Sequence, residues 1–283
     1  MKSINKALSI GVAFVLILSL LILALSATVP AFSASLSALL AATATPPPGD
    51  PIPLKPIADL TSLNATVDIG VNGLINDQRA QGGLNIQLTM NDQGQSKATV
   101  TGDLLGELAA QVGGSLVGLF TPSSVDLYKM PEGNYIVVNS LFPVCVKPKA
   151  TKSTVTLDEM SPQSLLGMFT SREVARGKLV GEEVLNGVPV KHYIINGDAF
   201  LAAAQKSRDP KLKAFGESLW SAEDADLYVD AKGGYPVAFR GSYSGEYEPL
   251  KFEGDFDVQI ELTGVNTNTP VRLPSSCNKP ITP

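Results

Sequence analysis

The feature that most constrains this chain is a strict alternation of apolar and polar residues along several segments. From Phe252 to Leu262 every second residue is apolar or glycine, and the residues between are charged or glutamine. The same two-residue period runs through 63–72 and 84–91. Successive side chains of a β-strand point to opposite faces, so each segment has one apolar and one wetted face. The pattern therefore predicts long strands in an antiparallel sheet.

Short turn signals separate these strands and predict hairpins. Asn186-Gly187 lies between the alternating segments 181–185 and 188–195. A two-residue Asn-Gly loop favours the type I′ turn that joins antiparallel strands. Residues rich in Gly, Asn, Asp and Pro predict further turns at 91–94, 131–134 and 231–234.

Three segments have a helical pattern instead. Apolar residues recur at helical spacing in 103–120, although Gly113-Gly114 weakens that helix. Residues 161–169 begin with a Ser N-cap and a Pro at the first helical position, and 198–220 predicts two helices with Asp209-Pro210 starting the second. The sequence contains no glycine-rich nucleotide loop and no alternating strand-helix-strand order. We therefore expect an α+β fold, an antiparallel sheet with a few helices laid against one face.

The N-terminal segment is typical of an export signal. Lys2 and Lys6 precede the apolar run Ala7–Ala27, and the next charged residue is Asp50. The run approaches the roughly 20 residues that cross a bilayer, so a cleaved signal peptide and a retained signal anchor both fit residues 1–34. In either case the remaining chain is expected outside the cytoplasm, in the cell envelope or secreted.

Residues 35–58 are poor in charge and contain six prolines, at positions 46, 47, 48, 51, 53 and 56. Proline at this density excludes helix and sheet interior and favours an extended chain. The segment is thus either a disordered leader or a spacer that holds a domain away from a membrane. We expect one globular domain to follow, from residue 59 to residue 283.

Composition and chemistry-bearing residues argue against several functions. The net charge of −5 and the absence of Lys/Arg blocks exclude a nucleic-acid footprint. His192 is the only histidine, whereas catalytic triads and metal sites need several converging groups. Neighbouring acids such as Asp255 and Asp257 share the wetted face of one strand, which does not provide carboxylates across a cleft. The sequence predicts a protein without catalytic residues, metal ligands or cofactor.

Cys145 and Cys277 are the only cysteines, and both follow the export segment. In an oxidising compartment such residues tend to pair. We expect a Cys145–Cys277 disulfide that ties the C-terminal tail to the sheet, with two free thiols as the alternative.

Two hairpin segments carry a family resemblance. The runs GEEVLNGVPVKHY at 181–193 and DLYVDAKGGYPV at 226–237 resemble the mycobacterial LppX/LprG lipoproteins, which are related in fold to the carriers LolA and LolB. The resemblance implies a strongly curved antiparallel sheet, an open half-barrel whose concave face is covered by helices. It also implies an apolar cavity for acyl chains between the two layers. Those lipoproteins have a lipid-modified cysteine after the signal, and here no cysteine precedes Cys145.

The resemblance and the pattern together predict an extracytoplasmic lipid carrier or chaperone that binds an acyl-chain ligand and meets a membrane. The alternative is an envelope sensing or protein-binding domain on the same fold, without a lipid. If helix 103–120 covers the concave face, residues four apart lie on one side of it. The expected cavity residues are Leu104, Leu108, Val112 and Leu116.

Overall fold

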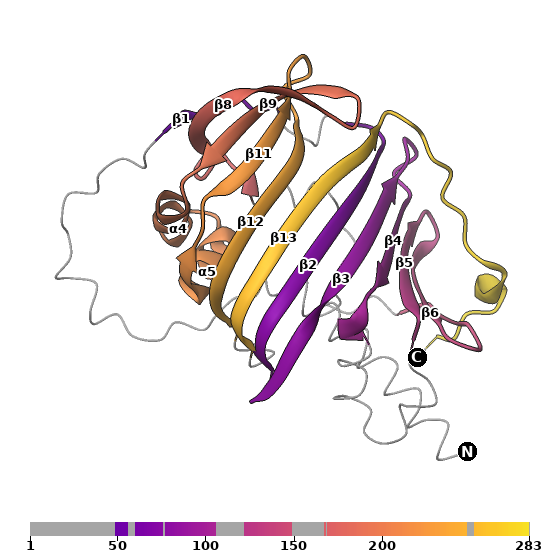
Figure 1. Cartoon of the computed structure of the whole chain (residues 1–283). Coiled ribbons are helices and arrows are strands. Elements are labelled where there is room, and N and C mark those ends of the chain that lie inside the picture. The colour runs from indigo at the N-terminus through magenta and orange to yellow at the C-terminus, as the bar shows by residue number, and fades with distance from the viewer. Residues whose placement is uncertain are drawn as a thin grey trace.

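The structure is a computed structural model that describes residues 49–55, 60–75, 77–105, 122–148, 167, 169–247 and 252–282. Thirteen strands form one antiparallel sheet that is open and strongly curved (Figure 1). Across the sheet the strands are β1 (Asp50–Pro51), β8 (Arg176–Leu185), β9 (Val188–Ile195), β11 (Ala225–Asp230), β12 (Pro236–Tyr247), β13 (Phe252–Val265), β2 (Leu63–Ile75), β3 (Gln78–Met90), β4 (Ser96–Thr101), β5 (Ser124–Met130), β6 (Gly133–Asn139) and β7 (Val144–Val146), with β10 (Leu219–Ala222) beside β12. The predicted α+β class with a curved sheet is confirmed.

The central strands follow the alternation seen in the sequence. In β2, Leu63, Ala65 and Val67 are buried, whereas Asp68 on the other face is exposed. The register aligns apolar residues across neighbouring strands, so that Val67 lies opposite Ile260 of β13 and Ile86 of β3. Each aligned row buries its apolar side chains on one face. This face of the sheet carries the core.

The predicted Asn-Gly hairpin joins β8 and β9. Asn186 has a φ of 50° and Gly187 a φ of 79°, so both residues have left-handed backbone as a type I′ turn requires. Further hairpins occur where turns were predicted, at 91–95, 131–132 and 231–235. Local turn chemistry thus fixes these connections.

Two helices, α4 (Gly197–Gln205) and α5 (Pro210–Ser218), follow β9. The Asn196 side chain caps α4 by accepting a hydrogen bond from the Ala199 N–H, and Asp209 caps α5. The predicted break at Asp209-Pro210 is confirmed. The predicted end of the second helix at Trp220 is wrong, because Leu219–Ala222 leave the helix to pair with β12 as strand β10.

The other two predicted helices fall largely outside the described residues. Of 103–120 the structure describes Asp103–Leu105, which are helical, and of 161–169 it describes Gly167 and Phe169, also helical. In the described part of the chain no helix is long and apolar enough to cross a membrane. The apolar run Ala7–Ala27 lies outside that part.

Part of the proline-rich segment packs on the domain. Asp50 and Pro51 form β1 at the edge of β8, opposite Gly177 and Arg176. The N–H of Ile52 then donates to the carbonyl of Ala175 at 3.0 Å, and the Ile52 side chain is buried in the main core. Proline is compatible with this position because it lacks a backbone N–H, and on an edge strand the side that faces solvent needs no donor.

The C-terminal strap, residues 266–282, runs from the end of β13 over the outer face of the sheet (Figure 1). A disulfide joins Cys277 to Cys145 of β7, residues that are 132 positions apart, as the sequence predicted. Ile281 adds a parallel bridge to Val146. Strap residues and β5–β7 form a second apolar cluster on the outer face, whose buried members are Tyr128, Tyr135, Val137, Cys145, Val271 and Cys277.

Candidate functional site

The concave face of the sheet, on which α4 and α5 lie, is a continuous apolar layer. From β12 through β13 and β2 to β3, the paired residues of this face are aliphatic, aromatic or glycine, apart from Gln78 at the exposed start of β3. No other amide and no charged side chain stands in these rows in the described strands. An apolar layer between sheet and helix either fills a core or lines a ligand cavity. Its two halves differ in composition.

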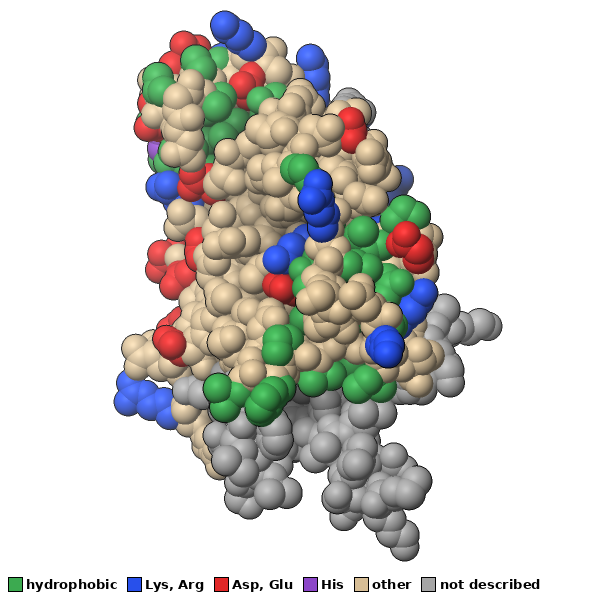
Figure 2. Space-filling view, turned by 90° about the vertical axis from the view of Figure 1, so that its right-hand side faces the viewer, with side chains coloured by type: hydrophobic (Ala, Val, Ile, Leu, Met, Phe, Trp, Pro, Cys, Tyr) green, Lys and Arg blue, Asp and Glu red, His purple; other side chains and the backbone are tan. Residues whose placement is uncertain are grey.

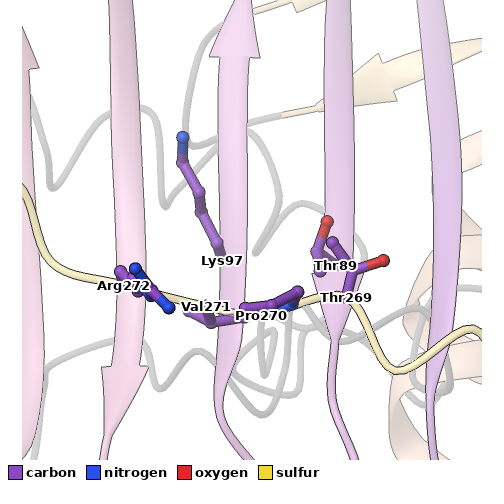
Figure 3. Close-up of a pocket in the computed structure, with 6 residues that line it drawn as sticks. All are labelled: Thr89, Lys97, Thr269, Pro270, Val271 and Arg272. Carbon is purple, nitrogen blue, oxygen red and sulfur yellow. The ribbon is translucent and has the colours of Figure 1, made fainter.

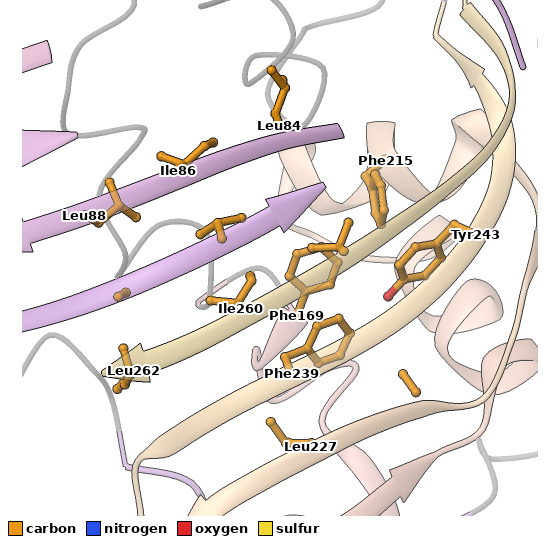
Figure 4. Close-up of a cluster of buried hydrophobic side chains, with 14 of the residues drawn as sticks. Leu84, Ile86, Leu88, Phe169, Phe215, Leu227, Phe239, Tyr243, Ile260 and Leu262 are labelled. Carbon is orange, nitrogen blue, oxygen red and sulfur yellow. The ribbon is translucent and has the colours of Figure 1, made fainter. Parts of the chain in front are cut away.

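The aromatic half lies under the two helices and is closely packed (Figure 4). Phe169 stacks on Phe239 of β12 with ring centroids 4.5 Å apart, and it meets Phe215 of α5 edge-on at 5.8 Å. Phe200 of α4 and Tyr243 of β12 complete the cluster at 5.7 Å from each other. Aromatic rings in these offset and edge-to-face contacts fill the space between the layers. This half is a core.

The aliphatic half lies along β2, β3, β4 and β5. The main contacts of α4 and α5 with the sheet are to β10 and β12, so these helices do not cover this half. Its side chains are small or branched and contain no polar atom. They are Ala65, Val67, Leu84, Ile86, Leu88, Ala98, Val100, Val125 and Leu127.

Of the expected cavity residues, the structure describes one. Leu104 is 1% exposed and lies against β3, where a Cβ on Gly82 would be 3.4 Å from its Cγ. It therefore sits on the aliphatic half of the concave face. Leu108, Val112 and Leu116 lie outside the described residues.

Tyr243 is the polar exception in the aromatic half. Its ring is 3% exposed, and its hydroxyl has no hydrogen-bond partner in the described chain. Burial raises the pKa of this phenol far above its ordinary value, because the charged form would lose its hydration. Gly241 makes room for it, since a Cβ there would lie 2.8 Å from the Tyr243 Oη. The sequence analysis did not single out Tyr243. The usable signal was Gly241, which stands two positions earlier on the same face of the strand and leaves room for a large side chain.

The outer face holds the polar residues singled out in the sequence. Asp255 and Asp257 accept hydrogen bonds from serines of β12 at 2.7 and 2.6 Å, as expected for a wetted face. His192 lies between Asp226, 2.6 Å from its Nε2, and Glu183, 3.4 Å from its Nδ1. Within the described residues no group of three or more potential metal ligands converges. These contacts give the outer face a structural role.

A pocket of about 320 Å³ lies between the C-terminal strap and the outer face (Figure 3). Thr89 and Lys97 form its floor, and residues 269–272 of the strap form its wall. The Lys97 ammonium points away from the strap, with Asp126 at 3.5 Å and the Tyr128 ring centroid at 5.5 Å. The pocket is on the face opposite the apolar layer. Two cations and two threonines share its lining with Pro270 and Val271, so an acyl chain would meet polar groups there.

The fold defines a class, an open curved antiparallel sheet with helices on its concave face, and the chain resembles the LppX/LprG lipoproteins. No family model and no curated protein matches the sequence. Among solved structures the chain is similar to LprF from Mycobacterium bovis, with 14% identity over 77% of this chain and 90% of that chain and a TM-score of 0.41. It is also similar to a putative outer membrane lipoprotein-sorting protein domain from Vibrio parahaemolyticus, with 6% identity over 74% and 87% of the two chains and a TM-score of 0.22. Similarity at this level carries no information about a ligand.

Proposed function

We propose that this protein is an extracytoplasmic lipid carrier or chaperone that holds acyl chains against the aliphatic half of the concave face. The observation that carries the proposal is an apolar layer wider than the two helices α4 and α5 that pack on its aromatic half. The export pattern of residues 1–34 supports a place outside the cytoplasm. The expected division into a signal or anchor (1–34), a linker (35–58) and a domain (59–283) belongs to the same proposal.

The composition of the aliphatic half suits a hydrocarbon chain. Each methylene removed from water contributes about 0.8 kcal/mol, and this gain needs apolar area rather than directed hydrogen bonds. A lining of Leu, Ile, Val and Ala leaves no polar group to desolvate when such a chain enters. We assign Leu104 to this lining, and extend it along the expected helix to Leu108, Val112 and Leu116.

The direct test is native mass spectrometry with lipid extraction on the full chain purified from a membrane-containing host. We expect a bound lipid that dissociates as a species with acyl chains. The matched variant is Ala98→Phe, because Ala98 lies between Leu88 and Leu127 in the aliphatic half. If a chain occupies this half, the new ring takes part of its place. Bound lipid and fatty-acyl probe binding should then fall while the melting temperature changes little.

Ala204→Phe provides the control. Ala204 is fully buried where α4 meets α5, and a Cβ on Gly216 would be 2.7 Å from the Ala204 Cβ. Overpacking so tight a contact should cost about 1–3 kcal/mol or more. Leu108→Trp is the corresponding test on the expected helix. If no lipid is bound by the wild type and Ala98→Phe destabilises as Ala204→Phe does, the aliphatic half is a filled core. That result would favour the sensing or protein-binding alternative.

A further inference from the structure

The pocket between the C-terminal strap and the outer face is bordered by two cations from different elements. Lys97 rises from β4, whereas Arg272 belongs to the strap (Figure 3). Among the described residues no Asp or Glu lines this pocket. Figure 2 faces the side of the molecule that carries the strap, and it shows Lys and Arg side chains close together near the middle of that face. In a chain with a net charge of −5, such a pocket is a local exception.

The two cations are not fully neutralised. Arg272 is exposed and forms no ion pair with the described part of the chain. Lys97 has one carboxylate partner, Asp126, whose Oδ2 is 3.5 Å from the ammonium. The same carboxylate also accepts hydrogen bonds from three uncharged donors, Thr99, Asn139 and Tyr128. Two cations thus share a single carboxylate, which leaves net positive charge beside the pocket.

The strap that forms the wall of the pocket is held on both sides. Before the pocket, the Asn64 amide donates to the Thr269 hydroxyl at 3.1 Å. After it, Val271 is buried in the second apolar cluster, and Cys277 is joined to Cys145 by the disulfide. A ligand would therefore meet a wall that is already in position. Because the Thr269 hydroxyl accepts from Asn64, its own proton remains available to a ligand.

We infer that this pocket binds a phosphate group, with Lys97 and Arg272 as its cationic partners. The hydroxyls of Thr89 and Thr269 are the further donors. Arginine and lysine are the two side chains that most often bind phosphate, the first as a planar fork and the second as a point charge. The site lies on the outer face, so the inference does not require that the concave face binds a lipid.

The lining favours phosphate over the other common anion, a carboxylate. A phosphate monoester carries a charge of about −1.5 to −2 at pH 7 and has three acceptor oxygens pointing in different directions. It can therefore be bound from the strap and from the sheet at once. A carboxylate has one charge and two oxygens in one plane, and it would use fewer of these groups. The volume of about 320 Å³ is small for a ligand site and suits a small phosphorylated molecule or a lipid headgroup.

Isothermal titration calorimetry of the full chain with inorganic phosphate tests the site. We expect a single phosphate to bind per chain. Arg272→Gln removes one cation from an exposed position and should weaken binding about tenfold or more, because a charge-assisted interaction is lost. Lys97→Gln should act in the same direction. The matched control is Lys232→Gln, which removes the same charge from an exposed position in the β11–β12 turn and should leave binding unchanged.

A second probe identifies the source of the phosphate group. Dihexanoyl phosphatidic acid, used below its micellar concentration, carries the same group on a short lipid. Tighter binding than that of inorganic phosphate would assign the pocket to a lipid headgroup, and equal or weaker binding to a free phosphate compound. Lipid held at the concave face would respond to Ala98→Phe and not to Arg272→Gln. Failure of the carrier proposal is therefore distinguishable from failure of this site.

Two results would overturn the inference. The first is that neither probe binds with an affinity that depends on Arg272. The second is that Lys232→Gln weakens binding as much as Arg272→Gln, which would show a general effect of net charge. Melting curves verify that each variant is folded. If Lys97→Gln does not fold because Asp126 loses its cation, Arg272→Gln still decides the question, since Arg272 is exposed.

Discussion

Replacing Tyr243 by phenylalanine should stabilise the protein. The Tyr243 ring packs among Phe200, Phe215 and Phe256, and phenylalanine keeps all of these contacts. The hydroxyl that is removed has no partner in the described chain. A buried hydroxyl without a hydrogen bond costs about 1–3 kcal/mol. We therefore expect the free energy of unfolding to rise by about 1 kcal/mol or more.

The same chemical change at Tyr128 should have the opposite sign. Tyr128 is also 3% exposed, but its hydroxyl donates to Asp126 Oδ2 at 3.4 Å. Asp126 keeps other donors, from Thr99 at 2.7 Å and Asn139 at 3.2 Å, after the phenol is gone. A net loss of about 0.5–1.5 kcal/mol is the expectation for one such bond. Size and hydrophobicity change equally in the two variants, so the difference isolates the hydrogen bond.

Urea unfolding measures both variants, with the midpoint and the slope fitted separately. For a domain of this size 1 kcal/mol corresponds to about 2–4 °C in melting temperature. The reasoning is refuted if Tyr243→Phe lowers the free energy of unfolding as Tyr128→Phe does. That outcome would show that the Tyr243 hydroxyl has a bound partner in solution, such as water or the head of a ligand.

Two further predictions concern the disulfide and high pH. Replacing Cys145 and Cys277 by serine should lower the free energy of unfolding by roughly 4–5 kcal/mol in the chain-entropy model, since the bond closes a loop of 132 residues. Intact mass before and after reduction and alkylation checks the bond itself. Two free thiols in the exported protein would contradict it. Burial raises the pKa of Tyr128, Tyr228, Tyr235 and Tyr243, with nearby Asp126 adding to the effect at Tyr128. Above about pH 10 the unfolded chain then releases protons that the folded chain retains, so the free energy of unfolding should be highest below pH 10 and fall as the pH rises. The fall should be gentler in Tyr243→Phe, which has one such phenol fewer. Urea midpoints that stay level between pH 8 and 11 would argue against this.

The sequence alone determined the local features. The two-residue period along Phe252–Leu262 identified a one-sided strand, because strand geometry sets that period whatever the partner is. Asn186-Gly187 specified its turn, and Asp209-Pro210 the start of α5, through backbone preferences of those residues. The two cysteines and their compartment suggested the disulfide. The same alternation predicted that one face of the sheet is apolar, which is the concave face of the structure.

Only the tertiary structure decided which segments meet. Val265 pairs with Leu63, and a pairing over such a distance along the chain depends on competition among all the strands. The same competition drew Leu219–Ala222 out of the predicted helix into β10. The orphan hydroxyl of Tyr243 depends on the absence of a neighbour, which a linear pattern does not encode. A local pattern predicts which face of a strand or helix is apolar. Only the packing of the whole chain determines what, if anything, lies against that face.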